Sequence, residues 1–410
     1  MEVLYARCAA LDVHKKTIVA CARCADGREV HRHVRTFGTT TKGLLELCAW
    51  LEQHGCTHVG MEATGVYWKP VWHVLEGHFE LVLGNAAHLK NVPGRKTDKN
   101  DAMWLADLMA CGLIKASFVP PTPIQQLRDL TRTRKQLVRE STQHVQRIQK
   151  VLEDANIKLD NVISDVMGLS GRAILRAMIG GESDPQKLAE LGHAQLKCSR
   201  EELAEALHGK VTDHHRFLLK LHLETYEQLH RSIDELEGHI ERHVGPFLED
   251  VELLKTIPGV SDVTAYVLMA EVGLDMSRFP TDANLRSWAG LCPGNDESAG
   301  KRKSTRIRHG APWLKETLVQ AAWAASRKRN TFFNARYYRV RARRGHKKAV
   351  VAVAAAMLTA AYHVLRTRTP YRELGPKHYE RRDVAKTTTH LLRRLHDLGV
   401  EVQIVATSAP

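Results

Sequence analysis

Long apolar segments are scarce in this chain of 410 residues. The most apolar stretch, residues 349–365, is rich in alanine, contains His363 and is shorter than the roughly 20 residues that a membrane-spanning helix needs. The N-terminal residues, MEVLYARCAALDVHKK, lack the apolar core and the cleavage site of a secretory signal peptide. We therefore expect a cytoplasmic protein with no membrane partner, in which residues 349–365 form a buried helix.

The eight cysteines do not form a zinc-binding pattern that the sequence alone reveals. Cys21 and Cys24 make a CxxC pair, but such zinc sites need a second pair at suitable spacing, and none follows. Because no secretory signal is visible, we expect a reducing compartment in which the cysteines stay free thiols.

Acidic residues are outnumbered, with 46 Asp and Glu against 60 Lys and Arg, which gives a net charge of +14. A surplus of this size favours a polyanionic partner such as nucleic acid. The chain is also too long for one core, so we expect several domains. Breaks at Val119–Pro123 and at Gly245-Pro246 suggest the boundaries. The expected regions are 1–120, 121–245, 246–375 and a peripheral tail, 376–410.

The N-terminal region alternates strand and helix patterns. The expected strands are 8–13, 17–23, 29–37, 57–61 and 80–84, and the expected helices are 44–54, 66–75 and 99–111. Three consecutive strands with short connections, followed by helix–strand repeats, match the element order of an RNase H-like fold. The predicted class is therefore α/β plus α, with an RNase H-like N-terminal domain and a mainly helical remainder.

Two long stretches, 125–156 and 214–243, carry apolar residues at three-, four- and seven-residue steps. Such stripes indicate helices that pair with one another. An intramolecular helical hairpin and a coiled coil that joins two copies of the chain both fit the pattern, and the two are compatible.

Four carboxylates in the first region suit a metal site. Asp12 and Glu62 follow predicted strands, while Asp98 and Asp101 lie three residues apart at a predicted helix start and share its face. Strand ends and helix starts meet at one edge of an α/β sheet, and Mg²⁺ prefers oxygen ligands. Taken singly, each acid is more simply explained as a helix cap or a turn residue than as a metal ligand.

Cations surround these acids, and those that we expect to contact DNA phosphates are Lys15, Lys96 and Lys99. Lys16 and Arg95 belong to the same charged runs. The alternative interpretation is an ordinary solvated face. Together the acids and cations favour a metal site that works on nucleic acid.

The C-terminal third begins with residues 256–265, TIPGVSDVTA, which look like a helix-hairpin-helix that turns at Gly259. The amides of such a turn and the following helix start hold a phosphate without reading sequence. The alternative is an ordinary pair of packed helices joined by a tight turn.

A polar loop with small residues follows around Ser298. A serine that accepts a phosphoryl group needs backbone room and nearby cations, as well as activation by a metal or a base. Gly300 gives room, and the cations are Lys301, Arg302, Lys303, Arg306 and Arg308. No base lies nearby in the sequence, so from spacing alone an ordinary loop serine remains the simpler interpretation.

The stretch 336–348 mixes cations with Tyr337 and Tyr338, which suits nucleic-acid backbones and stacking on bases. The expected backbone contacts are Arg339, Arg343 and Arg344. Here too the alternative is a solvated helix face, and RNA and DNA are not distinguished.

Several strings resemble the insertion-sequence transposases of the IS110 family, which have a DEDD, RuvC-like domain. They are LDVHK at 11–15, MEATGVYW at 61–68, GRKTDKNDA at 94–102 and SFVPP at 117–121. The resemblance covers nearly the whole chain. It implies a RuvC-like N-terminal domain in which Asp12, Glu62, Asp98 and Asp101 bind the metal.

The same resemblance implies that Ser298, which follows a Gly-Leu-x-Pro motif, is a nucleophile that forms a covalent phosphoserine intermediate. It further implies double-stranded DNA partners (element ends and target), a structured guide RNA called a bridge RNA, and a homo-oligomer, dimer or tetramer, with composite sites in the prokaryotic cytosol. Two alternatives remain open: a metal-dependent junction-resolving nuclease, and a DNA-binding protein without catalytic activity.

Overall fold

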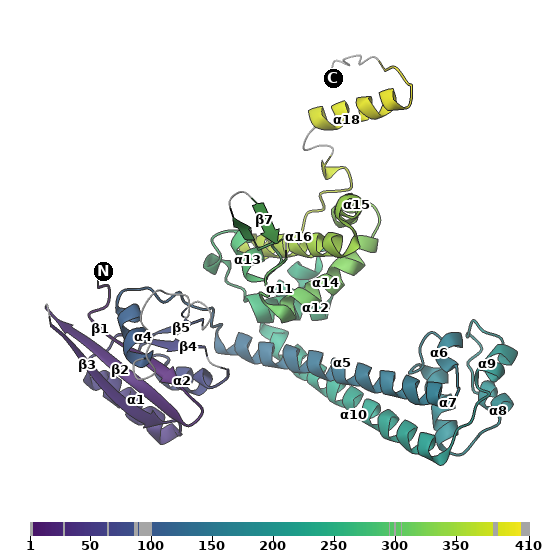
Figure 1. Ribbon diagram of the computed structural model, residues 1–410, viewed down its shortest axis with the longest axis horizontal. Helices are drawn as coiled ribbons and strands as arrows, with labels where there is room; N and C mark the ends of the chain where they lie inside the picture. The colour runs from purple at the N-terminus through teal and green to yellow at the C-terminus, as the bar shows by residue number, and fades with distance from the viewer. Residues whose placement is uncertain are drawn as a thin grey trace. The chain divides into compact units, whose positions relative to one another are not determined.

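The computed structural model describes residues 3–27, 29–63, 65–85, 89, 101–294, 296–298, 301–304, 306–379 and 384–402. The chain forms two compact units, Met1–Pro120 and Pro121–Pro410, which are described separately below. Asp98, Lys96 and Lys99 lie outside the described residues. Figure 1 labels most of the helices and strands of both units.

The first unit is built on a five-stranded sheet with the strand order β3-β2-β1-β4-β5 (Figure 1). The strands are β1 (Arg7–Val13), β2 (Thr17–Asp26), β3 (Glu29–Gly38), β4 (His58–Glu62) and β5 (Glu80–Gly84). β1, β2 and β3 pair antiparallel, whereas β4 lies parallel to both β1 and β5. All five expected strands are present, and an α/β N-terminal part is confirmed.

Helices cover both faces of this sheet, because successive side chains of a strand point to opposite faces. Leu11 and Met61 belong to a core with α1 (Thr41–Gln53) and α2 (Trp68–Leu75). Cys8 and Ala10 belong to a second core with α4 (Asp101–Ala110). The edge strand β3 is exposed apart from Phe37, and its charged residues are typical of a protected sheet edge.

The second unit begins with two long helices, α5 (Thr122–Asp154) and α10 (Asp213–Val244), that pack on each other as an intramolecular hairpin. Four short helices lie between them in the sequence: α6 (Leu159–Val162), α7 (Leu169–Ile179), α8 (Pro185–Glu190) and α9 (Arg200–Ala206). They form a small core with one end of the hairpin, which includes Ile148 and Leu219. The predicted hairpin is therefore confirmed, and the sequence analysis did not anticipate this small helical core.

The rest of the second unit is mainly helical. Its elements are η1 (Gly245–Phe247), α11 (Leu248–Lys255), α12 (Asp262–Val272), η2 (Met276–Arg278), α13 (Asp282–Trp288), β6 (Asp296–Ser298), β7 (Lys301–Ser304), α14 (Pro312–Arg327), α15 (Phe332–Arg344), α16 (His346–Thr367) and α18 (Val384–Asp397). α16 is long and apolar enough to cross a membrane by length and composition. Its residues Val353, Leu358 and Tyr362 are instead buried in the C-terminal core, as the buried-helix prediction expects.

A buried carboxylate joins the helical hairpin to this core. Glu271 of α12 is 3% exposed and accepts two hydrogen bonds from Arg132 of α5, at 2.7 and 2.8 Å. Arg128, one turn earlier, donates to the carbonyl oxygens of Ala270 and Glu271 at 2.8 and 3.1 Å. Burial lowers the pKa of Arg128, which marks the low polarity of this contact.

We expect replacement of Glu271 by alanine (E271A) to lower the free energy of unfolding by about 3 kcal/mol, because the largely buried Arg128 and the half-buried Arg132 both lose the carboxylate that pairs with them. The midpoint of urea unfolding measures the loss. E252A is the control, since the Lys255–Glu252 pair is exposed and contributes less than about 1 kcal/mol. Equal effects of the two substitutions would contradict a structural role for the Glu271 contact.

Candidate active site

The carboxyl ends of two adjacent parallel strands bring Asp12 and Glu62 to the same edge of the sheet. The register pairs Leu11 of β1 with Met61 of β4, so the next residues, Asp12 and Glu62, are neighbours. Leu11 and Met61 point into the core with α1, and the two acids therefore point to the opposite face, which α4 covers. Both acids are half-buried.

Helix α4 runs antiparallel to β1, so its first residue, Asp101, lies toward that same edge. Its last residue, Ala110, accepts hydrogen bonds from the amides of Leu4 and Tyr5, which precede β1. One turn earlier, Ala106 accepts a hydrogen bond from the Cys8 thiol over 3.7 Å. The helix start therefore lies farther along β1, on the side of Asp12, and Asp101 is half-buried there.

An ion-pair network holds α4 against the sheet. Asp107 accepts hydrogen bonds from Arg23 of β2 at 3.0 Å and from Arg32 of β3 at 2.9 Å. Arg23 is only 6% exposed, so Asp107 compensates the burial of its charge. The network fixes the helix that carries Asp101, and it joins residues so far apart in the sequence that no local pattern predicts it.

His14 is a neighbour of the site that the sequence analysis missed. Its Nε2 lies 3.1 Å from Oδ2 of Asp12, in the turn that leads to β2. Lys15 and Lys16 of the same turn are exposed. The spacing Asp12-x-His14 could have predicted this contact, because alternate residues at a strand end lie on one face.

The donor set of Asp12, Glu62 and Asp101 fits a hard divalent cation, since all three side chains offer carboxylate oxygens. Among the described residues, no three of these side chains bring their ligand atoms within 4.8 Å of one another. The described acids therefore share an edge of the sheet without forming a closed set of ligands, and Asp98 falls outside the described residues.

Ser298 lies in the second unit, at the end of strand β6. The expected loop is wrong here, because Asp296–Ser298 pairs antiparallel with β7, and Ser298 is in register with Lys301. Both strands are short and polar, so they lack the apolar alternation that indicates a strand. Ser298 and Lys301 are exposed. The serine is therefore presented to solvent on a two-stranded hairpin.

Close backbone contacts anchor this hairpin at its base. The amide of Gly294 donates to the carbonyl oxygen of Arg306 at 3.0 Å, and Pro293 forms a bridge with Ile307. Gly290 has a φ of +71°, and a Cβ there would lie 2.7 Å from the carbonyl oxygen of Arg308. Only glycine allows this approach. The Gly-Leu-x-Pro segment therefore positions the strands that carry Ser298.

The chain matches two protein families. The DEDD transposase domain of the IS110 family, described as "Transposase", matches residues 9–157. The Transposase IS116/IS110/IS902 family matches residues 251–338. Together these matches cover more than half of the chain and include Asp12, Glu62, Asp101 and Ser298. The chain belongs to the IS110 family of transposases.

No curated protein matches this transposase. Family membership implies that the enzyme binds DNA and cuts or recombines it, and the DEDD domain suggests that it depends on a divalent metal. The carboxylates belong to the first unit of the transposase, and Ser298 belongs to the second.

Several of the transposase's predicted DNA contacts lie in the hairpin that carries Ser298 or in the segment at its base. Arg306 and Arg308 are exposed, and Arg302 and Lys303 lie in β7, where the structure describes their backbone alone. The hydroxyl of Ser304, the other serine nearby, accepts a hydrogen bond from the Arg306 amide at 3.1 Å. Contact of these cations with nucleic acid stays a prediction.

In the basic helix α15, one of the two tyrosines that we expected to stack on bases is buried. Tyr337 is only 6% exposed, and its hydroxyl lies 2.6 Å from Nδ1 of His346, so stacking of Tyr337 on a base is wrong. Tyr338 is exposed, as are Arg339, Arg343 and Arg344. Positive charge near a helix C-terminus also stabilises the helix itself. Of the two tyrosines, Tyr338 is therefore the one that is exposed and can stack on a base.

Gly259 lies in the turn between α11 and α12, where the sequence suggests a helix-hairpin-helix. Its φ is +88°, and a Cβ would lie 2.7 Å from the carbonyl oxygen of Ala321 and 2.8 Å from Cβ of Ala325. Packing against α14 therefore requires glycine. Ser261 caps α12, and Asp262 places an acid at the same helix start. Contact of this turn with a phosphate stays a prediction.

We expect G259A to lower the free energy of unfolding by about 2 kcal/mol or more, since it combines left-handed backbone strain with overpacking. Thermal denaturation of the full-length transposase measures the effect. G238A is the matched control, because Gly238 is helical within α10 and a Cβ there would meet only the flexible end of Arg242, at 3.9 Å. If G259A is as stable as G238A, the close approach to α14 is not required.

Proposed function

We propose that this transposase cuts and rejoins double-stranded DNA at its element ends and target through Ser298, with Mg²⁺ bound by Asp12, Glu62, Asp98 and Asp101. The observation that carries the proposal is the shared edge of Asp12, Glu62 and Asp101 in a five-stranded sheet. An exposed serine on an anchored hairpin supports it. The sheet order further supports an RNase H-like, RuvC-like fold for residues 1–120.

The serine step exchanges one phosphodiester for another. The Ser298 Oγ forms a bond to the phosphorus and gives up its proton to solvent, to which the serine is exposed. The bond from phosphorus to the departing strand oxygen breaks, and that oxygen gains a proton. A strand hydroxyl then displaces the serine in the reverse sense. No oxidant or energy source is needed, because bond types are conserved.

The residues around each group have distinct roles in this scheme. Bound Mg²⁺ supplies charge stabilisation for the phosphoryl transfer. Lys301, in register with Ser298, holds the scissile phosphate, Arg306 and Arg308 at the base of the same hairpin hold flanking phosphates, and Lys15 binds the DNA backbone near the carboxylates. Lys96 and Lys99, outside the described residues, belong to the same group of contacts.

A structured guide RNA supplies sequence choice and pairs with donor and target DNA. The resemblance carries this part of the proposal. The exposed Arg339, Arg343 and Arg344 of α15 offer a cationic surface for either nucleic acid. The charge of +14 supports a polyanionic partner. We place the enzyme and this partner in the cytoplasm.

The active form is a homo-oligomer in which the carboxylates and Ser298 come from different protomers. The helical hairpin leaves large apolar side chains exposed at Val138, Phe217 and Leu221, and these support contacts between copies. The regions 121–245 and 246–375 then act as assembly and serine domains, and 376–410 remains peripheral.

The deciding experiment looks for a covalent protein–DNA adduct. Full-length transposase is incubated with Mg²⁺, its co-purified RNA and a labelled duplex that spans one end of its element. The proposal requires an adduct that survives denaturation and maps to Ser298 by mass spectrometry. Strand cleavage with no adduct would instead support a metal-dependent nuclease, since the carboxylates all lie within one unit.

A further inference from the structure

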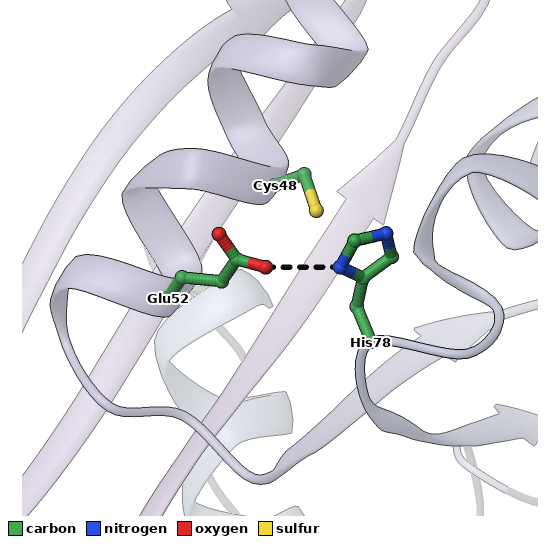
Figure 2. Close-up of side chains that lie close together, drawn as sticks. All are labelled: Cys48, Glu52 and His78. Carbon is green, nitrogen blue, oxygen red and sulfur yellow. Dashed lines mark hydrogen bonds and ion pairs between the residues drawn. The ribbon is translucent and has the colours of Figure 1, made fainter.

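Three side chains of types that can bind a metal ion lie close together on the first unit, away from the carboxylate edge. Cys48 and Glu52 lie one turn apart on α1, and His78 lies between α2 and β5. Their ligand atoms all lie within 4.8 Å of one another. Figure 2 shows the three side chains turned toward one another. Nδ1 of His78 is 2.9 Å from Oε1 of Glu52. The cluster thus joins two segments that are distant in sequence.

An ion pair between Glu52 and His78 does not explain the position of the third side chain, the Cys48 thiol. Glu52 and His78 are about half-exposed, which is ordinary for a surface pair. Cys48 is only 6% exposed, yet its sulfur points into the gap between them (Figure 2). Burial raises the pKa of this thiol, and Glu52 adds to the effect, so Cys48 lacks the features of a reactive cysteine.

We propose that Cys48 Sγ, Glu52 Oε1 and His78 Nδ1 bind one zinc-like divalent transition ion, with water as the fourth ligand. A sulfur, oxygen and nitrogen set suits Zn²⁺ and does not suit Mg²⁺, which prefers oxygen alone. Bond lengths of about 2.0–2.3 Å place tetrahedral ligands roughly 3.3–3.8 Å apart, so the site closes with shifts of about 1 Å. The exposed sides of Glu52 and His78 leave room for water.

This site is separate from the proposed Mg²⁺ site. Cys48 belongs to the core between the sheet and α1, whereas Asp12 and Glu62 face α4 on the other side of the sheet. The ion links the C-terminal turn of α1 to the turn before β5. Its binding stabilises the folded unit by linkage, because the three ligands come together only in the fold.

Cobalt titration of chelator-treated, full-length protein tests the site. We expect one equivalent of Co²⁺ to produce thiolate-to-cobalt charge-transfer absorption in the near ultraviolet. Zn²⁺ then displaces the cobalt and raises the melting temperature. The band should vanish in C48S, and H78N should weaken binding at least about tenfold. Absence of the band in the wild type, or its persistence in C48S, would overturn the site.

Matched variants separate this site from its neighbours. C111S removes another thiol of the same unit, and E46Q removes an exposed acid of α1, so both should keep the band. D12N with D101N should also keep it, because an oxygen-only site gives no thiolate absorption. If C48S does not fold, as judged by circular dichroism, H78N decides: unchanged cobalt affinity in H78N contradicts the proposal.

Discussion

Replacement of Ser298 by alanine (S298A) is expected to abolish the covalent protein–DNA adduct and to reduce strand cleavage by at least about a thousand-fold. Loss of a catalytic nucleophile has effects of this size or greater, because the remaining groups cannot perform the same step. The serine is exposed on β6, so the substitution removes a hydroxyl from the surface and leaves no cavity. Gel analysis of denatured reactions with labelled DNA measures both quantities.

S304A is the matched control for this prediction. Ser304 lies in the partner strand β7, and its hydroxyl accepts a hydrogen bond from Arg306 within the hairpin. Its loss should leave adduct formation within a few-fold of wild type, since a single hydrogen bond contributes about 1 kcal/mol. If cleavage survives undiminished in S298A, the serine mechanism is wrong and the metal-dependent nuclease takes its place.

Replacement of Asp12 or Asp101 by asparagine (D12N, D101N) is expected to lower strand cleavage by about a hundred- to a thousand-fold. Each change removes a negative charge from the metal site and keeps the side-chain volume. Stabilisation of the transition state by the metal is worth several kcal/mol, and each 1.4 kcal/mol is a factor of ten. The rate as a function of Mg²⁺ concentration is the measurement, and the variants should need more Mg²⁺ for the same rate.

D26N controls for the general loss of one acid from the same sheet. Asp26 ends β2 and pairs with Arg7 at the surface, where such a pair contributes less than about 1 kcal/mol. Its activity should match the wild type. Full activity of D12N and D101N in a recombination assay would contradict the metal site and favour a DNA-binding protein without catalytic activity.

Strong local patterns allowed the elements of the first unit, the two long helices of the hairpin and the apolar helix α16 to be predicted from the sequence. The expected strand 8–13 corresponds to Arg7–Val13, and the expected helix 214–243 corresponds to Asp213–Val244. Alternation of apolar residues and regular helical stripes are local properties, so they survive without knowledge of the tertiary contacts. The α/β N-terminal part and the helical remainder followed from them.

The errors occurred where local patterns are weak. The hairpin of β6 and β7 is short and polar, and backbone contacts such as Gly294–Arg306 define it. Tyr337 occurs in a run of cations that suggests exposure, yet packing in the C-terminal core buries it. Burial of one residue in a charged helix depends on which face the core covers, and composition does not record that face.

The sequence by itself determined the family, through strings such as MEATGVYW, and it named Asp12, Glu62, Asp101 and Ser298 as candidates. Only the tertiary structure decided which of these share an edge. The parallel pairing of β1 with β4 and the antiparallel course of α4 bring three acids there. The tertiary structure alone also placed His78 beside Cys48 and Glu52. Contacts between residues that are distant in sequence depend on strand register and helix direction. Packing across the whole unit fixes both.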